Sequence, residues 1–229
     1  RLHGEELWQR FKRDGPLSPA LACAFAIDIL RGLEDAHRAG LVHRDIKPAN
    51  IFLCDAHERP EFEAPPDSRP TACIIDFGVA RHMETVDPRL TLDGHAVGTP
   101  HYMSPEQVEC GEIDGRTDIY SLACLLYECI SGVLPFEGTN SLAILVARLR
   151  EEPRPLRDVV KTDLPDRFMA VVMGALERDP NRRPSDATAF RVQLEAQMPA
   201  LVDLVAAGRR TQELAMADTI DSTPTSHPK

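Results

Sequence analysis

The sequence predicts an α+β fold that is mainly α-helical and carries one small β-hairpin. Over several long segments, apolar residues recur at intervals of three and four, which is the spacing of helices that bury one face. Only two short apolar runs, residues 50–54 and 72–77, read as strands, and two strands are too few to form a sheet core. The 229 residues, of which 43% are hydrophobic, suffice for one sizeable core with a tail.

Two helices are expected before the hairpin. The segment GEELWQRFKRDG (residues 4–15) has apolar residues at helical spacing and stops at a Gly-Pro pair. The longer segment 18–40 begins with Ser18 as a helix N-cap and Pro19 at the first helical position, and Gly40 closes it. Its apolar residues are dense, so this helix is expected to be largely buried.

The hairpin is expected to have a long loop, because residues 55–71 (DAHERPEFEAPPDSRPT) are rich in proline and charge. The chain is irregular from residue 78 to 99. Apolar residues at helical spacing then predict four more helices, at residues 117–132, 140–152, 166–179 and 185–198. The end of the chain, 218–229, has little apolar content and is expected to be disordered.

Charge and hydropathy exclude several classes of partner. The formal net charge is −10, and an acidic chain binds nucleic acids and anionic membranes poorly, so no nucleic-acid partner is expected. No apolar run approaches the length of a membrane span, and no signal peptide is visible. The first residue is Arg1 rather than Met, so the natural start is expected to lie upstream.

The cysteines favour a reducing compartment. None of the six forms a Cys-x-x-Cys pair, and several lie inside apolar runs, at positions 23, 54, 73, 110, 124 and 129. This pattern favours reduced structural thiols over disulfides or a zinc site, and it predicts a cytoplasmic location.

Five short motifs carry the chemistry. Each alone is weak evidence, since an Asp–Asn pair in a loop is usually part of a turn. Together they occur in a fixed order: HRDIKPAN (43–50), DFG (76–78), GTPHYMSPEQ (98–107), DIYSLACLLYECISGVLPF (118–136) and DPNRRPS (179–185). In this order they resemble the catalytic loop, metal-binding motif, activation-segment end, central helix and late arginine of protein kinases. Over roughly residues 1–196, the chain resembles eukaryotic-like serine/threonine protein kinases, most closely the bacterial ones.

The resemblance implies a site for ATP and Mg²⁺. Asp45 would accept the proton of the substrate hydroxyl, and Lys47 would neutralise charge on the transferred phosphate. Asn50 and Asp76 would be the Mg²⁺ ligands, since this hard cation prefers oxygen. Phe52 would contact the nucleotide beneath the adenine.

Other motif residues are expected to be structural. By resemblance, His43 and Phe77 belong to a regulatory hydrophobic spine, Gly78 completes the DFG motif, and Asp118 hydrogen-bonds the backbone of the catalytic loop. A buried ion pair that pins the activation segment is expected between Glu106 and Arg183.

The activation segment offers two threonines of interest. Thr99, in the GTP motif, would meet the catalytic loop and help to shape the substrate pocket. Thr91 would be phosphorylated in trans, because Arg44 precedes Asp45 and a nearby phosphate would form charge-assisted hydrogen bonds with it. The alternative is that Thr91 is an ordinary loop threonine.

The small lobe of a kinase is not visible in the sequence. Before residue 41 there is no G-x-G-x-x-G loop, no lysine strand of the V-A-I-K type and no helix glutamate to pair with that lysine. We therefore expect residues 1–199 to be the C-terminal, larger lobe of a kinase domain, and residues 200–229 to be a flexible tail.

The functional prediction is a serine/threonine protein kinase that transfers the ATP γ-phosphate to serine or threonine hydroxyls of protein substrates. As a piece without its small lobe, the isolated chain is expected to be inactive and to self-associate through exposed apolar surface near Phe52 and Phe77. The alternatives are a non-catalytic, pseudokinase-like scaffold and a gene remnant without function. The coding sequence upstream of Arg1 would discriminate among the three.

Overall fold

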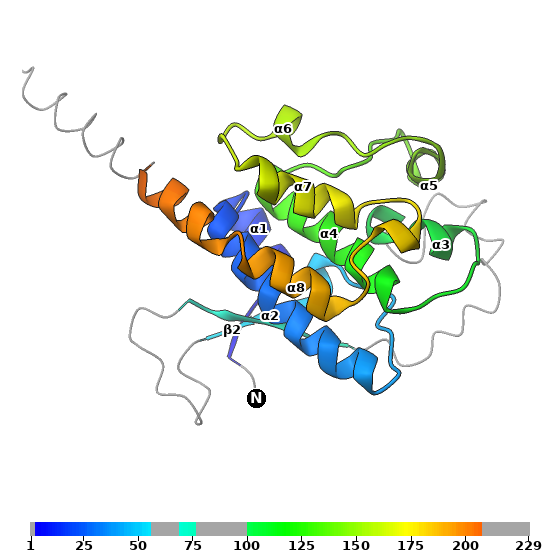
Figure 1. Ribbon diagram of the computed structural model, residues 1–229, viewed down its shortest axis with the longest axis horizontal. Helices are drawn as coiled ribbons and strands as arrows, with labels where there is room; N and C mark the ends of the chain where they lie inside the picture. Colours follow the sequence, from blue (N-terminus) through cyan, green and yellow to red (C-terminus); the bar gives the residue numbers. More distant parts are fainter. Residues whose placement is uncertain (1–2, 56–68, 77–99, 208–229) are drawn as a thin grey trace, which may run out of the picture.

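The computed structural model of the protein describes residues 3–55, 69–76 and 100–207 (Figure 1). Over these residues the fold is α+β and mainly helical, as predicted. The helices are α1 (Leu7–Asp14), α2 (Pro19–Arg38), α3 (Pro105–Val108), α4 (Gly115–Ser131), α5 (Ser141–Arg150), α6 (Leu156–Val159), α7 (Asp166–Ala175) and α8 (Ala187–Glu195). The strands are β1 (Gly4–Glu6), β2 (Ile51–Cys54) and β3 (Thr71–Ile74).

Helix α2 lies at the centre of the fold. It contacts the sheet through β3 on one side and helices α4 and α8 on the other (Figure 1). Its start follows the local sequence: the Ser18 side chain accepts a hydrogen bond from the Leu21 backbone N–H, and Pro19 is the first helical residue. The helix ends at Arg38, just before Gly40, whose φ of +76° suits glycine.

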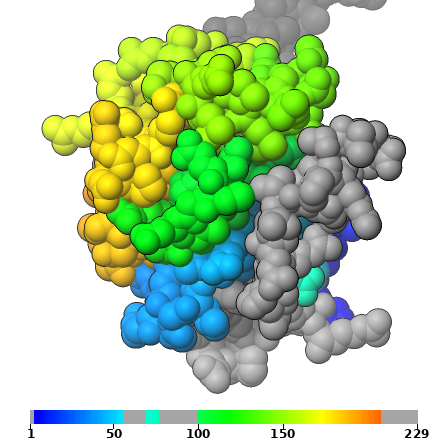
Figure 2. Space-filling model, turned by 90° about the vertical axis from the view of Figure 1, so that its right-hand side faces the viewer, coloured from blue at the N-terminus to red at the C-terminus, as the bar shows by residue number. Residues whose placement is uncertain are grey.

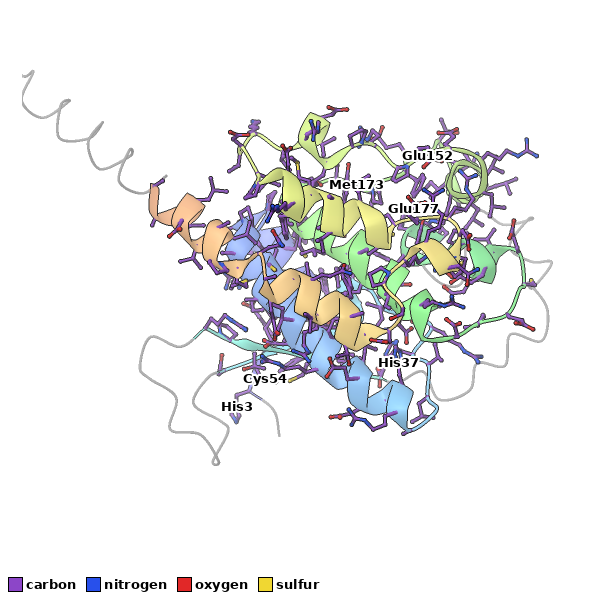
Figure 3. The ribbon with its side chains drawn as sticks, viewed as in Figure 1. His3, His37, Cys54, Glu152, Met173 and Glu177 are labelled. Atoms are coloured by element: carbon purple, nitrogen blue, oxygen red, sulfur yellow. The ribbon has the colours of Figure 1, made fainter. Side chains whose placement is uncertain are left out.

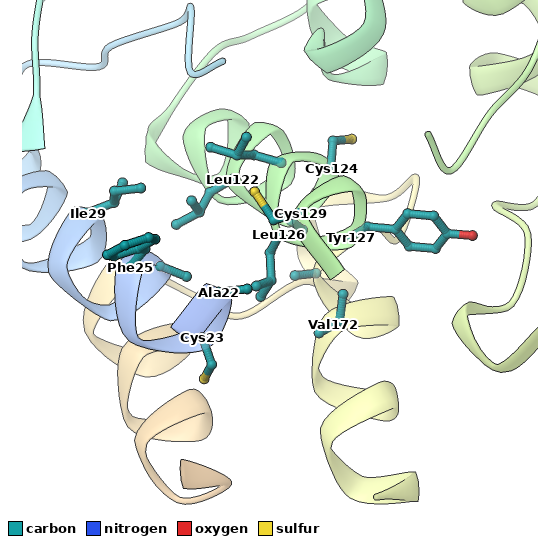
Figure 4. Packing of buried hydrophobic residues seen from close by; sticks show 14 of the residues in the cluster. Ala22, Cys23, Phe25, Ile29, Leu122, Cys124, Leu126, Tyr127, Cys129 and Val172 are labelled. Atoms are coloured by element: carbon teal, nitrogen blue, oxygen red, sulfur yellow. The ribbon is translucent and has the colours of Figure 1, made fainter. Parts of the chain in front are cut away.

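The core forms where α2, α4 and α7 meet. Phe25 and Ile29 of α2 pack near Leu122 and Leu126 of α4, and Val172 of α7 closes the cluster (Figure 4). All five side chains are buried. Helix α4 is apolar on almost every side, which is typical of a helix surrounded by protein. Seen from the side, the blue end of α2 lies below the green surface of α3 and the start of α4, with α5 above them (Figure 2).

The predicted hairpin is present, but it belongs to a three-stranded antiparallel sheet of order β1-β2-β3. The helix expected over residues 4–15 begins only at Leu7, because Gly4–Glu6 pair with β2 as the third strand. Gly4 permits this pairing: its φ is +146°, and a Cβ atom there would lie 1.9 Å from the Leu53 carbonyl oxygen.

The two faces of the sheet differ. Leu53 and Ala72, which are opposite each other, are buried on the face that packs against α2. Phe52 and Cys73 form the neighbouring opposite pair, so they point to the other face, where both are half-buried. This second face carries the predicted nucleotide contact.

The chain continues as a helix over residues 198–207, in which Leu201 is buried in the core. The boundary predicted between residues 199 and 200 therefore falls within a helix, and the division into a domain and a tail stays a prediction. Among the described residues, none of the helices combines the length and the apolar character that crossing a membrane requires.

Candidate active site

The segment that precedes β2 is fixed by one buried carboxylate. Asp118, in the first turn of α4, is fully buried and accepts hydrogen bonds from the backbone N–H groups of His43 (2.9 Å) and Arg44 (2.8 Å). The sequence predicted this contact with the loop backbone. Because a buried carboxylate must be satisfied by donors, the loop and α4 are coupled at this point.

A third partner of Asp118 was not predicted. His37 lies near the end of α2 (Figure 3). Its Nε2 atom is 2.7 Å from the Asp118 carboxylate. Its ring lies where Gly115 leaves room, since a Cβ atom at that glycine would come within 2.7 Å of the imidazole. Asp118 thus joins α2, α4 and the loop at residues 43–50, and no local sequence pattern marks His37 for this role.

Arg44 adopts a backbone conformation that non-glycine residues seldom take, with φ of +66°. Its N–H is bound by Asp118, and its carbonyl oxygen accepts a hydrogen bond of 2.8 Å from the Gln107 side chain. Such a conformation costs about 1–3 kcal/mol and persists only where the surroundings determine it. The Arg44 side chain is exposed, and no hydrogen bond or ion pair of its guanidinium occurs within the described part of the chain.

Asp45, Lys47 and Asn50 form one cluster directly after Arg44. The Lys47 Nζ atom lies 2.7 Å from Asp45 Oδ2. The Asn50 side-chain amide donates to the Asp45 carbonyl oxygen at 2.7 Å and to Asp45 Oδ2 at 3.0 Å. The Asp45 side chain is 51% exposed, so its carboxylate is accessible from solvent.

The end of β3, which leads to Asp76, is joined to this cluster through the backbone. The backbone N–H of Ile75 donates to the Asn50 carbonyl oxygen at 2.9 Å, which ties the end of β3 to the loop. The next residue, Asp76, is exposed and has φ of +53°, a second left-handed conformation at this site. Phe52, in β2, follows Asn50 by two residues.

The donor chemistry of this region fits Mg²⁺. The nitrogen of the Asn50 amide is engaged by Asp45, which leaves the amide oxygen as the available ligand atom. Asp76 supplies an exposed carboxylate. Amide and carboxylate oxygens are the protein ligands that this cation takes.

Glu106 and Arg183 form the buried ion pair that the sequence predicted. Two hydrogen bonds of 2.8 Å join the guanidinium to the carboxylate, and Thr117 donates to the same carboxylate at 2.7 Å. Arg183 also donates to three backbone carbonyl oxygens and lies over the Tyr120 ring, 4.8 Å from its centre. Burial alone would raise the pKa of Glu106, but the hydrogen bonds from Arg183 and Thr117 outweigh it and hold that pKa below its usual range.

A second buried arginine was missed from the sequence. Arg148, in α5, is 1% exposed and donates to the carbonyl oxygens of Pro100 and His101. Its guanidinium lies 5.7 Å and 5.5 Å from the ring centres of Tyr120 and Phe136. It therefore holds the chain at the end of the GTP motif, and its position inside an apolar helix was the only available signal.

Four residues of the predicted site lie outside the described residues: Phe77, Gly78, Thr91 and Thr99. His43 is buried at 2% exposure, and its Nδ1 atom accepts from the Asp45 backbone N–H at 3.3 Å. The structure thus brings together Asp45, Lys47, Asn50 and, through Ile75, the chain that carries Asp76.

Comparison with known proteins identifies this arrangement. Residues 1–194 match the protein kinase domain family. The chain is 34% identical over 196 residues to the serine/threonine-protein kinase pkn3 of Myxococcus xanthus, covering 84% of this chain and 34% of pkn3. It is 36% identical over 195 residues to the serine/threonine-protein kinase PknL of Mycobacterium tuberculosis, covering 85% of this chain and 45% of PknL. The chain thus spans about a third of the length of pkn3 and less than half that of PknL.

The solved structures agree at the level of the fold. A crystal structure of the Rad53 kinase domain and SCD2 in complex with AMPPNP superposes with a TM-score of 0.61 at 23% identity. The superposition covers 83% of this chain and 64% of that one. The chain therefore belongs to the protein kinase family, among the bacterial-type serine/threonine protein kinases.

Proposed function

We propose that this chain carries the catalytic loop and metal ligands of a protein kinase that transfers the γ-phosphate of ATP to serine or threonine hydroxyls of protein substrates. The observation that carries the proposal is the cluster of Asp45, Lys47 and Asn50 on a loop whose backbone is bound by the buried Asp118. Family membership alone would also fit a scaffold, but a scaffold has no need of an exposed carboxylate held between a lysine and an amide.

Each side chain has a role that its surroundings favour. Asp45 would orient the substrate hydroxyl and take its proton, since its carboxylate is half exposed. Lys47, 2.7 Å from Asp45, would move to the transferred phosphate when substrate is present. Asn50 and Asp76 would hold Mg²⁺, which when bound neutralises charge on the nucleotide phosphates. Phe52 would lie against the adenine.

ATP is the proposed nucleotide because the family uses it and because the structurally similar Rad53 was crystallised with AMPPNP. We further propose that residues 1–199 form the larger lobe of the kinase domain. A polypeptide of these 229 residues alone contains no glycine-rich loop and no lysine strand. We expect it to bind ATP·Mg²⁺ weakly and to phosphorylate nothing at a useful rate.

The decisive experiment supplies a small lobe. The N-terminal part of the PknL kinase domain would be fused ahead of Arg1, and the chimera would be incubated with radiolabelled ATP, Mg²⁺ and a generic serine/threonine substrate. Phosphate transfer is expected. Asp45→Asn should lower it by roughly 10²–10⁴-fold, the usual contribution of a general base. Asp35→Asn, an exposed carboxylate on α2, is the matched control and should leave the rate unchanged.

The result separates kinase from scaffold. A folded chimera that binds ATP·Mg²⁺ and transfers no phosphate would favour the scaffold. Transfer that persists in Asp45→Asn would remove that residue from its proposed role. Robust transfer by the 229-residue chain alone would show that the small lobe is dispensable.

Thr91 is the proposed regulatory site, phosphorylated in trans. The structure supports it through Arg44, whose exposed guanidinium has no partner within the described residues. Mass spectrometry of the active chimera after incubation with ATP should find phosphate on Thr91, and Thr91→Ala should lower the rate. Phosphate at another residue, or an unchanged rate in Thr91→Ala, would rule Thr91 out as the switch.

A cytoplasmic location is proposed on two grounds. ATP is the proposed substrate, and all six cysteine side chains are thiols, which fits a reducing compartment. Self-association of the 229-residue chain is proposed as well, because apolar side chains such as Leu41 and Leu142 are more than half exposed. Light scattering at high concentration would test it, and a uniform monomer would contradict it.

A further inference from the structure

Two cysteines meet on the sheet face that carries Phe52. Cys54 ends β2 and Cys73 lies in the middle of β3, and their sulfur atoms are 3.4 Å apart. The register places Cys54 opposite Thr71 and Cys73 opposite Phe52, so the two cysteines are diagonal neighbours across the strand pair. The antiparallel ladder itself holds the two thiols in contact.

We propose that Cys54 and Cys73 are a redox modification site, at which a hydroperoxide oxidises the two thiols to an intramolecular disulfide. The proposal depends on the contact of the two sulfur atoms and on their position in the sheet, and it does not depend on kinase activity.

The reaction balances with hydrogen peroxide as the oxidant. The sulfur of the more exposed Cys73 attacks one peroxide oxygen, the O–O bond breaks, and a sulfenic acid and one water form. The Cys54 sulfur then attacks the Cys73 sulfur, the S–O bond breaks, and the oxygen leaves as a second water. Two thiols lose two electrons and two protons in total, and one peroxide is reduced to two waters.

The geometry predicts a labile bond. Diagonal Cα atoms in a sheet lie about 7–8 Å apart, whereas disulfides usually need about 4.4–6.8 Å, so the strands must close slightly. Cys54 is the last residue of β2, and Thr71, opposite it, is the first of β3, so within the described residues this pair is the end of the ladder. A strained disulfide is easily reduced, which suits a reversible modification in a reducing compartment.

The other cysteines provide internal controls. Cys23, Cys124 and Cys129 are buried in the helical core, and burial raises the pKa of Cys23 to about 12 and that of Cys124 to about 11. Buried thiols of this kind are inert toward an external oxidant. Cys54 is buried as well, and in the proposed reaction it attacks only the oxidised sulfur of Cys73, with which it is in contact. Cys110 is exposed and far along the chain, so Cys110→Ser removes the main route to disulfides between chains.

The test uses the full 229-residue chain carrying Cys110→Ser. It is treated with hydrogen peroxide, alkylated without reduction, and analysed by intact mass and peptide mapping. The expected result is a mass loss of two hydrogen atoms, loss of the Cys54 and Cys73 thiols together, a peptide cross-linked between them, and recovery of both thiols with dithiothreitol. Cys54→Ser and Cys73→Ser should each abolish the cross-linked peptide, while Cys23, Cys124 and Cys129 stay reduced.

Three results would overturn the proposal. The first is oxidation of Cys73 to sulfinic acid while Cys54 keeps its thiol. The second is a disulfide that pairs either cysteine with another residue or another chain. The third is oxidation of Cys124 or Cys129 before the pair in β2 and β3.

Discussion

The catalytic loop and the Glu106–Arg183 region each contain a carboxylate paired with a basic side chain, but the two pairs differ in their exposure to solvent. At Glu106 the carboxylate is 10% exposed and its arginine partner is fully buried. At Asp45 the carboxylate is 51% exposed, and its lysine partner is 21% exposed. The first pair is enclosed by protein, whereas the second faces solvent.

The difference separates stability from chemistry. Removing one partner of a buried ion pair greatly lowers the free energy of unfolding, because the remaining charge is left unpaired and cannot be solvated. An exposed pair contributes little to the free energy of folding, and its side chains are free to take other partners. Asp118 belongs with the first kind: it is buried, and it holds the exposed loop in place through backbone hydrogen bonds. Substitutions in the two regions should therefore affect different measurements.

The largest effect is expected from breaking the buried pair. Arg183→Met should lower the free energy of unfolding by about 3–5 kcal/mol, because Glu106 is left as an unpaired buried charge. Urea denaturation followed by circular dichroism measures this. Arg182→Met is the matched control: its side chain is 69% exposed, and its loss should cost less than about 1 kcal/mol. Equal effects of the two substitutions would contradict the comparison.

Acid should weaken the same pair. The folded-state pKa of Glu106 lies below its ordinary value of 4.5, so its stabilisation is fully present above about pH 4.5 and is lost as pH falls through the folded pKa. Below that point the protonated carboxyl resembles glutamine. The stability difference between the natural chain and Glu106→Gln should therefore stay constant from neutral pH to about pH 4.5 and shrink as the pH falls further, as measured by urea midpoints at each pH. A difference independent of pH would show that Glu106 acts by packing alone.

A smaller loss is expected at Asp118. In Asp118→Asn the side-chain nitrogen cannot accept a hydrogen bond from a backbone N–H, so one of His43 and Arg44 loses its partner. Hydrogen bonds to charged groups contribute about 1.5–3 kcal/mol, and the unfolding free energy should fall by that amount. Amide hydrogen exchange should also accelerate at residues 43 and 44 and stay unchanged at the core of α7. Unchanged exchange in the loop would mean that Asp118 does not hold it.

The smallest effect on stability is expected at Asp45. Asp45→Asn removes an exposed charge, so the unfolding free energy should change by no more than about 0.5 kcal/mol. In the active chimera the same substitution should lower transfer by roughly 10²–10⁴-fold. A loss of stability comparable to that of Arg183→Met would show that the exposed cluster is structural, and the distinction between the two regions would fail.

Local features of the fold were predictable because their physics is local. The N-cap of α2 depends on Ser18, Pro19 and the residues that follow directly. A short stretch of sequence is therefore enough to predict where this helix begins. The same holds for the helical spacing of α4, α5, α7 and α8 and for the two strands of the hairpin. The third strand was not predictable in this way, since Gly4–Glu6 pair with residues almost fifty positions away.

Within the site, the motifs identified Asp45, Lys47, Asn50, Asp118 and the Glu106–Arg183 pair. The structure added partners that no motif contains. His37 reaches Asp118 across 81 positions, and Arg148 reaches Pro100 across 48. Each is a polar residue in a largely apolar helix, and such a residue has many potential partners until the helices are packed.

By itself, the sequence determined the family and the order of most elements, and it supplied the residues proposed for the reaction, because motifs and helical spacing are contained in short continuous stretches of sequence. Only the tertiary structure decided which buried polar groups support the loop, that β1 completes the sheet, and that Cys54 meets Cys73. The physical reason is that a buried hydrogen bond or sulfur contact depends on distances of a few ångströms between segments far apart in sequence. Those distances are set by how α2, α4 and the sheet pack, and no single segment encodes them.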